Sequence, residues 1–278
     1  MANITAGDVN KLRQMTGAGM MDCKNALVEC DGDFDQAVDH LRKKGQKIAS
    51  KRADRDANEG IVLGKVSKDE TFASIIMLNC ETDFVAKNQE FIDFAKKVSD
   101  ITIEKQPKSL DELNEIMIDG FSIAENIMNM IGKIGEKLSL SRYEFITSEK
   151  VFSYNHQGNR LATIVGFNKS ESPNLADIGH EIAMQIAAMA PVALDEESVD
   201  QKTIENELEV GREQARLDGK PENMIEKIAE GKLKKFFKDS TLLNQDFVRD
   251  TKKSVGQFIV ELDKDLKVNS FKRLMLGA

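Results

Sequence analysis

The sequence contains no tryptophan, few aromatic residues (6%), and only three cysteines and three histidines in 278 residues. The cysteine number is odd and the first two cysteines fall within an amphipathic pattern, so we expect reduced, buried thiols of the kind found in a cytosol. No cysteine or histidine has the spacing of a metal site, and the sequence predicts neither a metal nor a cofactor. The residues concerned are Cys23, Cys30, Cys80, His40, His156 and His180.

Long apolar runs and catalytic motifs are also missing. No stretch is long and apolar enough to span a bilayer, and the first residues lack the charged and apolar order of a signal peptide. We therefore expect a cytoplasmic protein with no membrane partner. The sequence has no phosphate loop, no dinucleotide fingerprint and no Gly-x-Ser-x-Gly elbow. We expect binding without bond-making chemistry, so the chain is not predicted to be an enzyme.

The net charge of -8 and the pI of about 5.2 argue against a surface that attracts nucleic acid as a whole. One segment, residues 42–58, is rich in lysine, arginine and alanine. Nucleic-acid binding would need an aromatic or grooved context that this segment lacks. A solvated linker helix explains it better, and no direct nucleic-acid contact is predicted.

Residues 1–45 have the pattern of three short helices around one small core. Thr5 and Asp8 have capping-box spacing, Asp33 is placed to cap the third helix, and Gly45 is placed to end it. With the basic segment, this predicts a three-helix N-terminal module and linker over residues 1–55.

Two later segments repeat one order of elements. Residues 59–105 read as strand, turn, strand and helix, and residues 150–191 repeat that order at similar lengths. We expect an α+β core of two similar halves, each a small antiparallel sheet with a helix on one face, over 56–146 and 147–194. Residues 110–134, between the repeats, have helical spacing and predict a helix.

The remaining sequence predicts two further parts. Residues 195–237 are highly charged, with apolar residues at helical spacing on either side of a turn, which predicts a coiled-coil helical hairpin inserted in the second half. Residues 238–278 contain a short helix and a final strand, which predict the end of the core and a C-terminal module.

The connection from Thr82 to Asn88 follows the second predicted strand and precedes a clear amphipathic helix that Asn88 can cap. Phe84 lies outside both periodic patterns. Large apolar residues are usually buried, so this reasoning favours a satellite core residue over one held out for a partner. The second repeat has no Asp-Phe at this place, which argues that the fold alone does not need it. The tandem Met20 and Met21 leave core filling and an adaptable surface contact about equally favoured.

Two segments resemble signatures of the bacterial translation elongation factor Ts family. They are Thr16-Gly17-Ala18-Gly19-Met20-Met21-Asp22-Cys23-Lys24, followed by Ala26-Leu27, and Thr82-Asp83-Phe84-Val85-Ala86-Lys87-Asn88. Shorter segments around Ile134, His156, Gly219 and Gln245 fall where that family has similar ones, and the order of parts matches over the whole chain.

The resemblance implies a ubiquitin-associated-like N-terminal module and a guanine-nucleotide exchange factor that releases GDP from the GTPase elongation factor Tu. It implies that Thr82, Asp83, Phe84 and Val85 disturb the magnesium and nucleotide site of that GTPase. It further implies partner contacts at Arg13, Met20, Met21, Lys24, Ile134, His156 and Val248, the last beside an Arg249 that is less apolar than in some family members.

Two other function classes stay open at this stage. A structural adaptor would grip a partner through the N-terminal helices without changing its nucleotide, and would have no use for an exposed Asp83-Phe84. A thiol enzyme would need a lowered pKa at Cys23. The sequence leaves the oligomeric state open, a homodimer included.

Overall fold

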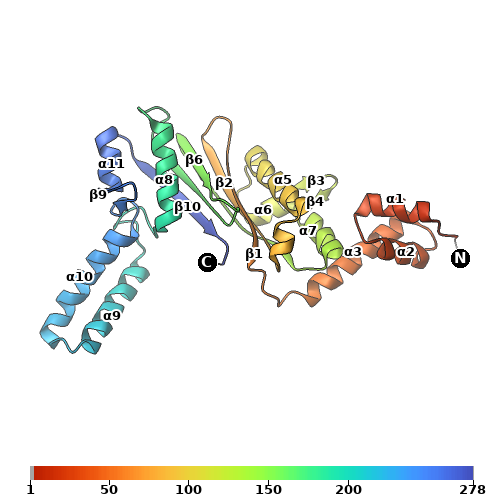
Figure 1. Cartoon of the computed structure of the whole chain (residues 1–278), viewed down its shortest axis with the longest axis horizontal. Coiled ribbons are helices and arrows are strands. Elements are labelled where there is room, and N and C mark those ends of the chain that lie inside the picture. The colour runs from red at the N-terminus through yellow and green to blue at the C-terminus, as the bar shows by residue number, and fades with distance from the viewer. Residues whose placement is uncertain (1–2, 278) are drawn as a thin grey trace. The chain divides into compact units, whose positions relative to one another are not determined.

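The computed structural model describes residues 3–277 (Figure 1). Their contacts divide the chain into two units. One unit comprises the chain up to residue 63 together with 76–144 and the last residues from 275. The other comprises 64–75 and 145–274. The five-part division expected from the sequence stays a prediction. The mixture of helices with small antiparallel sheets confirms the α+β class.

The first unit begins with three helices, α1 (Ala6–Thr16), α2 (Met20–Glu29) and α3 (Phe34–Lys51). The predicted capping box of Thr5 and Asp8 starts α1, and the Asp33 side chain accepts the Gln36 N–H at the start of α3. The three helices close over a small apolar core, because their stripes meet at helical spacing. Its buried members are Val9, Leu12, Cys23, Ala26, Leu27 and Ala37.

The expectation that Gly45 ends α3 is wrong, because the helix continues to Lys51. Gly45 instead allows α3 to approach α7 (Ile123–Ile134) closely. A Cβ at Gly45 would lie 3.0 Å from the carbonyl oxygen of Met128 and 3.6 Å from the Cα of Gly132. The two glycines therefore form a point where the helix backbones touch.

The prediction of one helix over residues 110–134 is also wrong. The chain forms α6 (Leu110–Glu115), a short antiparallel pair β3 (Met117–Ile118) and β4 (Phe121–Ser122), and then α7. Asp119 and Gly120 make the turn with φ values of 53° and 87°. The helix α6 ends before this turn, because Ile116 is already extended, with a ψ of 134°. The left-handed turn joins the two short strands, and Ser122 with Glu125 builds a capping box that starts α7.

Two three-stranded sheets follow the predicted repeat of elements. The first has the order β1-β2-β5, from β1 (Glu59–Val66), β2 (Phe72–Cys80) and β5 (Leu138–Thr147). After β2 come the short α4 (Asp83–Ala86) and the long α5 (Gln89–Lys105). All nine residues of β2 are buried, as expected for a central strand.

The second unit contains the other sheet, with the order β10-β7-β6, from β6 (Lys150–Asn155), β7 (Leu161–Phe167) and β10 (Val268–Met275). The helix α8 (Leu175–Met189) packs against β6 and β7, and Pro191 follows its end. Ile178, Ile182 and Ile186 meet Val165 and Phe167 in one apolar cluster. In both repeats, two consecutive strands of one sheet are thus followed by a long helix, which is α5 in the first repeat and α8 in the second.

Residues 201–262 of the second unit form three helices and one small strand pair. The predicted hairpin consists of α9 (Gln201–Leu217) and α10 (Glu222–Ser240), which touch where Gly211 meets Ala229. The guanidinium of Arg212 on α9 donates to both carboxylate oxygens of Glu226 on α10. The antiparallel β8 (Asp246–Phe247) and β9 (Asp250–Ser254) then lead into α11 (Val255–Leu262). Among residues 3–277, no helix has both the length and the apolar character to cross a bilayer.

Candidate functional site

The connection between β2 and α5 is a capped helical turn. Thr82, in extended conformation, accepts the Val85 N–H at 3.4 Å and so begins α4. Asn88 accepts the Glu90 N–H at 2.9 Å and begins α5, as its sequence position predicts. Two successive caps leave a helix of only four residues between them, and this helix buries no side chain.

Phe84, on this short helix, is the most exposed aromatic residue of the described chain, with 83% of its surface accessible. The sequence-based preference for a satellite core residue is therefore wrong. Val85, the next residue, is half-buried. Exposing a phenylalanine forgoes the roughly 1.5–3 kcal/mol that its burial would contribute, so this placement calls for an explanation outside the fold.

Asp83 presents a carboxylate beside the exposed ring. Its Oδ2 lies 2.6 Å from the Lys87 Nζ, one helical turn further along. The hydrogen bond from Lys87 lowers the pKa of Asp83, so the carboxylate is charged at neutral pH. Ion pairs this exposed contribute little to stability, and the carboxylate can leave Lys87 for another partner at small cost.

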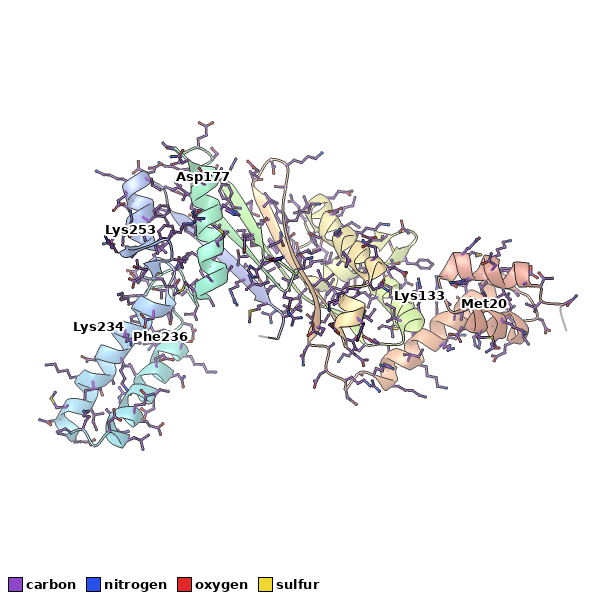
Figure 2. The ribbon with its side chains drawn as sticks, in the orientation of Figure 1. Met20, Lys133, Asp177, Lys234, Phe236 and Lys253 are labelled. Atoms are coloured by element: carbon purple, nitrogen blue, oxygen red, sulfur yellow. The ribbon has the colours of Figure 1, made fainter. Side chains whose placement is uncertain are left out.

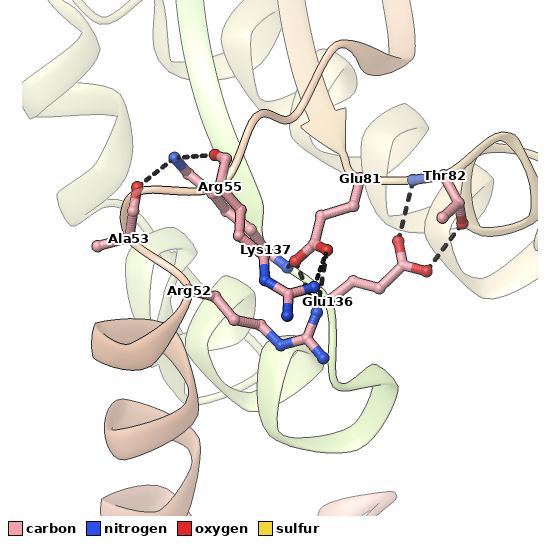
Figure 3. Close-up of polar contacts among 7 residues, drawn as sticks. All are labelled: Arg52, Ala53, Arg55, Glu81, Thr82, Glu136 and Lys137. Atoms are coloured by element: carbon pink, nitrogen blue, oxygen red, sulfur yellow. Dashed lines mark hydrogen bonds and ion pairs between the residues drawn. The ribbon is translucent and has the colours of Figure 1, made fainter.

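A charged cluster holds the base of the turn (Figure 3). Glu81 accepts hydrogen bonds from the Arg52 and Arg55 guanidinium groups at 2.8–3.0 Å and from the Lys137 backbone N–H at 2.6 Å. Burial alone would raise the pKa of Glu81, but these donors lower it to about 2. The prediction of a solvated linker over 42–58 needs correcting here, because Arg52 fixes the end of that segment to Glu81.

Thr82 itself is held by Glu136, which follows the end of α7. One Glu136 oxygen accepts the Thr82 N–H at 3.1 Å, and the other accepts its hydroxyl at 2.8 Å. Ile134, a predicted contact residue, is the half-buried last residue of α7, and Gly135 ends the helix with a φ of 78°. The turn and the end of α7 are therefore joined through two hydrogen bonds.

The four predicted contact residues of the N-terminal module are all exposed on α1 and α2. Met20 and Met21 are the first residues of α2, with 58% and 64% of their surfaces accessible, and Met20 is labelled in Figure 2. Arg13 and Lys24 are exposed near them in sequence. Met20 and Met21 therefore do not fill the core of the module, which holds Cys23 and Leu27 instead.

His156 and Val248, far apart in sequence, line one groove of about 370 Å³ in the second unit. His156 follows β6, and its Nδ1 lies 2.9 Å from the Tyr154 hydroxyl. Val248, 51% exposed, follows β8. Arg249 beside it pairs with Glu181 of α8 at 2.7 Å. The structure thus brings two predicted contact residues to one surface, although the sequence places them almost a hundred residues apart.

Sequence reasoning missed three side chains that hold these surfaces. Glu81 and Glu136 hold the turn. Gln185, 2% exposed, accepts the Val248 N–H at 2.9 Å and so fixes the edge of the groove. The position of Gln185 in the sequence could have indicated its burial, because Gln185 lies three residues after Ile182 on the apolar stripe of α8.

The cysteines do not form a reactive site. Cys23 and Cys80 are buried, and burial raises the pKa of both thiols, that of Cys80 to about 12. This is the opposite of what the thiol-enzyme alternative requires. Within residues 3–277, no group of histidine, cysteine and acidic side chains could hold a metal ion.

Comparison with known proteins identifies the family. The family model described as Elongation factor TS matches residues 81–278. Proteins named Elongation factor Ts match over nearly their whole length: that of Christiangramia forsetii is 48% identical over 277 residues, covering all of both chains, and that of Amoebophilus asiaticus is 47% identical over 275 residues, covering 99% of each. That of Flavobacterium psychrophilum is 47% identical over 277 residues, again covering both chains fully. The chain belongs to the elongation factor Ts family.

Proposed function

We propose that the chain performs the exchange function of its family, promotion of GDP release from elongation factor Tu, by inserting the turn with Asp83 and Phe84 into the nucleotide site of that GTPase. The observation that carries this proposal is the 83% exposure of Phe84 on a turn whose base is fixed by Glu81 and Glu136. An exposed aromatic ring on a rigid support has the form of an anchor for a partner.

The two residues at the tip have different chemical tasks in this proposal. Phe84 packs between partner side chains and displaces the elements that hold Mg²⁺. The Asp83 carboxylate exchanges Lys87 for backbone or side-chain donors of the partner and holds the displaced arrangement. Thr82 and Val85 complete the turn, since the Thr82 hydroxyl caps the N–H of Val85.

The remaining contacts supply affinity. Arg13, Met20, Met21 and Lys24 grip the nucleotide-binding domain from the N-terminal module, where flexible methionines suit an adaptable apolar contact. Ile134 and the groove with His156 and Val248 bind another domain of the partner. All these contacts take place in the bacterial cytoplasm, without nucleic acid or membrane as a direct partner.

Exchange follows from reciprocal coupling. An exchange protein of this kind binds the GTPase more tightly when the grip of the GTPase on Mg²⁺ and GDP is disrupted. Because coupling is reciprocal, it lowers the affinity of the GTPase for GDP by the same ratio by which GDP lowers the affinity of the GTPase for the exchange protein. Each ~1.4 kcal/mol of this difference changes affinity about tenfold. Incoming GTP then displaces the factor, so the chain makes and breaks no covalent bond.

The test is the release of a fluorescent GDP from elongation factor Tu with the chain present at substoichiometric amounts. We expect accelerated release with turnover, each copy of the chain acting on many copies of the GTPase. Binding without acceleration would contradict the proposal and support the adaptor alternative, in which the N-terminal helices alone are used.

A further inference from the structure

Two glutamates form a reciprocal clamp between segments 81–82 and 136–137, seen in Figure 3. Glu136 accepts the N–H and the hydroxyl of Thr82, at 3.1 and 2.8 Å. Glu81 accepts the N–H of Lys137 at 2.6 Å. Each carboxylate therefore satisfies the backbone of the opposite segment, and neither segment can turn without breaking a charge-assisted hydrogen bond.

The clamp acts at the point from which Phe84 projects. Thr82 is the N-cap of α4, and Phe84 is the second residue of that helix. A helix of four residues has no stability of its own, and α4 buries none of its side chains. Its direction therefore depends on how its N-cap residue is held, and Glu136 accepts both the N–H and the hydroxyl of Thr82.

One further feature fits Glu136 to this task. Gly135, with a φ of 78°, ends α7 and turns the chain so that the next side chain faces Thr82. The clamp thus connects the tip to a long helix.

We propose that Glu136 is a positioning residue for exchange, which holds Thr82 so that Phe84 points into the partner. This inference rests on the proposed function. Both carboxylate oxygens of Glu136 are engaged within the chain, so it acts through Phe84 and does not need to touch the nucleotide site. The wild-type chain accelerates GDP release. Loss of the clamp lowers the rate of GDP release within the complex with the GTPase more than it weakens formation of that complex.

The first test compares Glu136→Ala, Glu136→Gln and Glu125→Ala. Glu125 is a matched control, because its carboxylate accepts the Ser122 N–H at 2.8 Å at the other end of α7. We expect Glu136→Ala to lower the maximal rate of labelled GDP release about tenfold, with little change in the half-saturating concentration. Glu136→Gln should keep most of the rate, because its amide can accept the Thr82 N–H and donate to the hydroxyl. Glu125→Ala should leave the rate unchanged.

The second test is the double variant Phe84→Ala with Glu136→Ala. If Glu136 acts only through Phe84, the double variant releases GDP no more slowly than Phe84→Ala alone. Multiplying effects would overturn the inference, as would a wild-type rate in Glu136→Ala or an equal loss in Glu125→Ala. If only the inference about Glu136 is wrong, the wild-type chain still accelerates GDP release and Phe84→Ala still slows it. If the wild-type chain does not accelerate GDP release, the proposed function is wrong as well.

Discussion

Phe84 and Phe91 are seven positions apart, yet the structure gives them opposite environments. Phe84 is 83% exposed, and Phe91 on α5 is fully buried. We predict that Phe84→Ala leaves the free energy of unfolding unchanged, because the ring makes no core contact. Phe91→Ala should cost about 3–5 kcal/mol, since it removes a buried aromatic ring. Urea unfolding of both variants measures this, and a destabilised Phe84→Ala would mean that the ring contributes to the fold.

These two residues also show what a sequence can reveal at this scale. Phe91 lies on a periodic apolar stripe, and its burial follows from that stripe. Phe84 lies outside any period, so general burial statistics gave the wrong answer. The absence of Asp-Phe from the second repeat indicated that the fold does not need this pair, and the family resemblance indicated a partner contact, which leaves no periodic pattern of its own. The roles of the individual contact residues stay predictions.

The base of the turn gives a pH prediction. The donors around Glu81 hold its pKa at about 2, below the ordinary 4.5 of an unfolded chain. A lowered folded-state pKa stabilises the protein fully above the unfolded value, and this contribution is lost as the pH falls from about 4.5 toward 2. Glu81→Gln removes the charge, so we expect it to be less stable at pH 7 by about 1–3 kcal/mol.

The difference in unfolding free energy between wild type and Glu81→Gln should therefore shrink between pH 5 and pH 2. Urea titrations at several pH values measure it. A difference that stays constant over this range would show that the carboxylate charge does not contribute.

The contact of α3 with α7 at Gly45 gives a second prediction for the elements. Gly45→Ala and Gly231→Ala make the same change inside a helix, and alanine is favoured there by about 1 kcal/mol. A Cβ at Gly231 meets nothing within 4 Å, so that variant should be stabilised. At Gly45 the Cβ meets the Met128 carbonyl at 3.0 Å and α7 must move. We expect Gly45→Ala to be neutral or destabilised, and equal stabilisation of both variants in thermal unfolding would contradict the close contact.

The boundaries of helices were predicted correctly where the residues that set them lie close together in the sequence. The caps at Thr5, Asp33 and Asn88 were predicted correctly, because capping is decided within four residues. The end of α3 was misplaced because Gly45 serves a contact with α7, almost ninety residues away in sequence. The helix over 110–134 was overextended because neither the extended Ile116 that follows α6 nor the left-handed turn at Asp119 and Gly120 has an apolar pattern of its own.

For the whole molecule, the proposal separates affinity from acceleration. Met20 and Met21 lie on the N-terminal module and Phe84 on the turn after β2. We predict that Met20→Ala with Met21→Ala raises the half-saturating concentration of the chain in GDP release about tenfold or more, by loss of an apolar contact. The maximal rate should stay close to that of the wild type. A fall in the maximal rate with unchanged half-saturation would assign these methionines to the disturbance of the nucleotide instead.

The most direct measurement is the maximal rate of fluorescent GDP release from elongation factor Tu, taken at saturating wild-type chain, Phe84→Ala and Met117→Ala. Met117 is a matched control, an apolar residue 60% exposed on β3. We predict that Met117→Ala matches the wild type and that Phe84→Ala is slower by at least about tenfold, as truncation of an aromatic anchor costs roughly 2 kcal/mol or more. A Phe84→Ala chain that releases GDP as fast as the wild type would contradict the central claim that this exposed ring drives exchange.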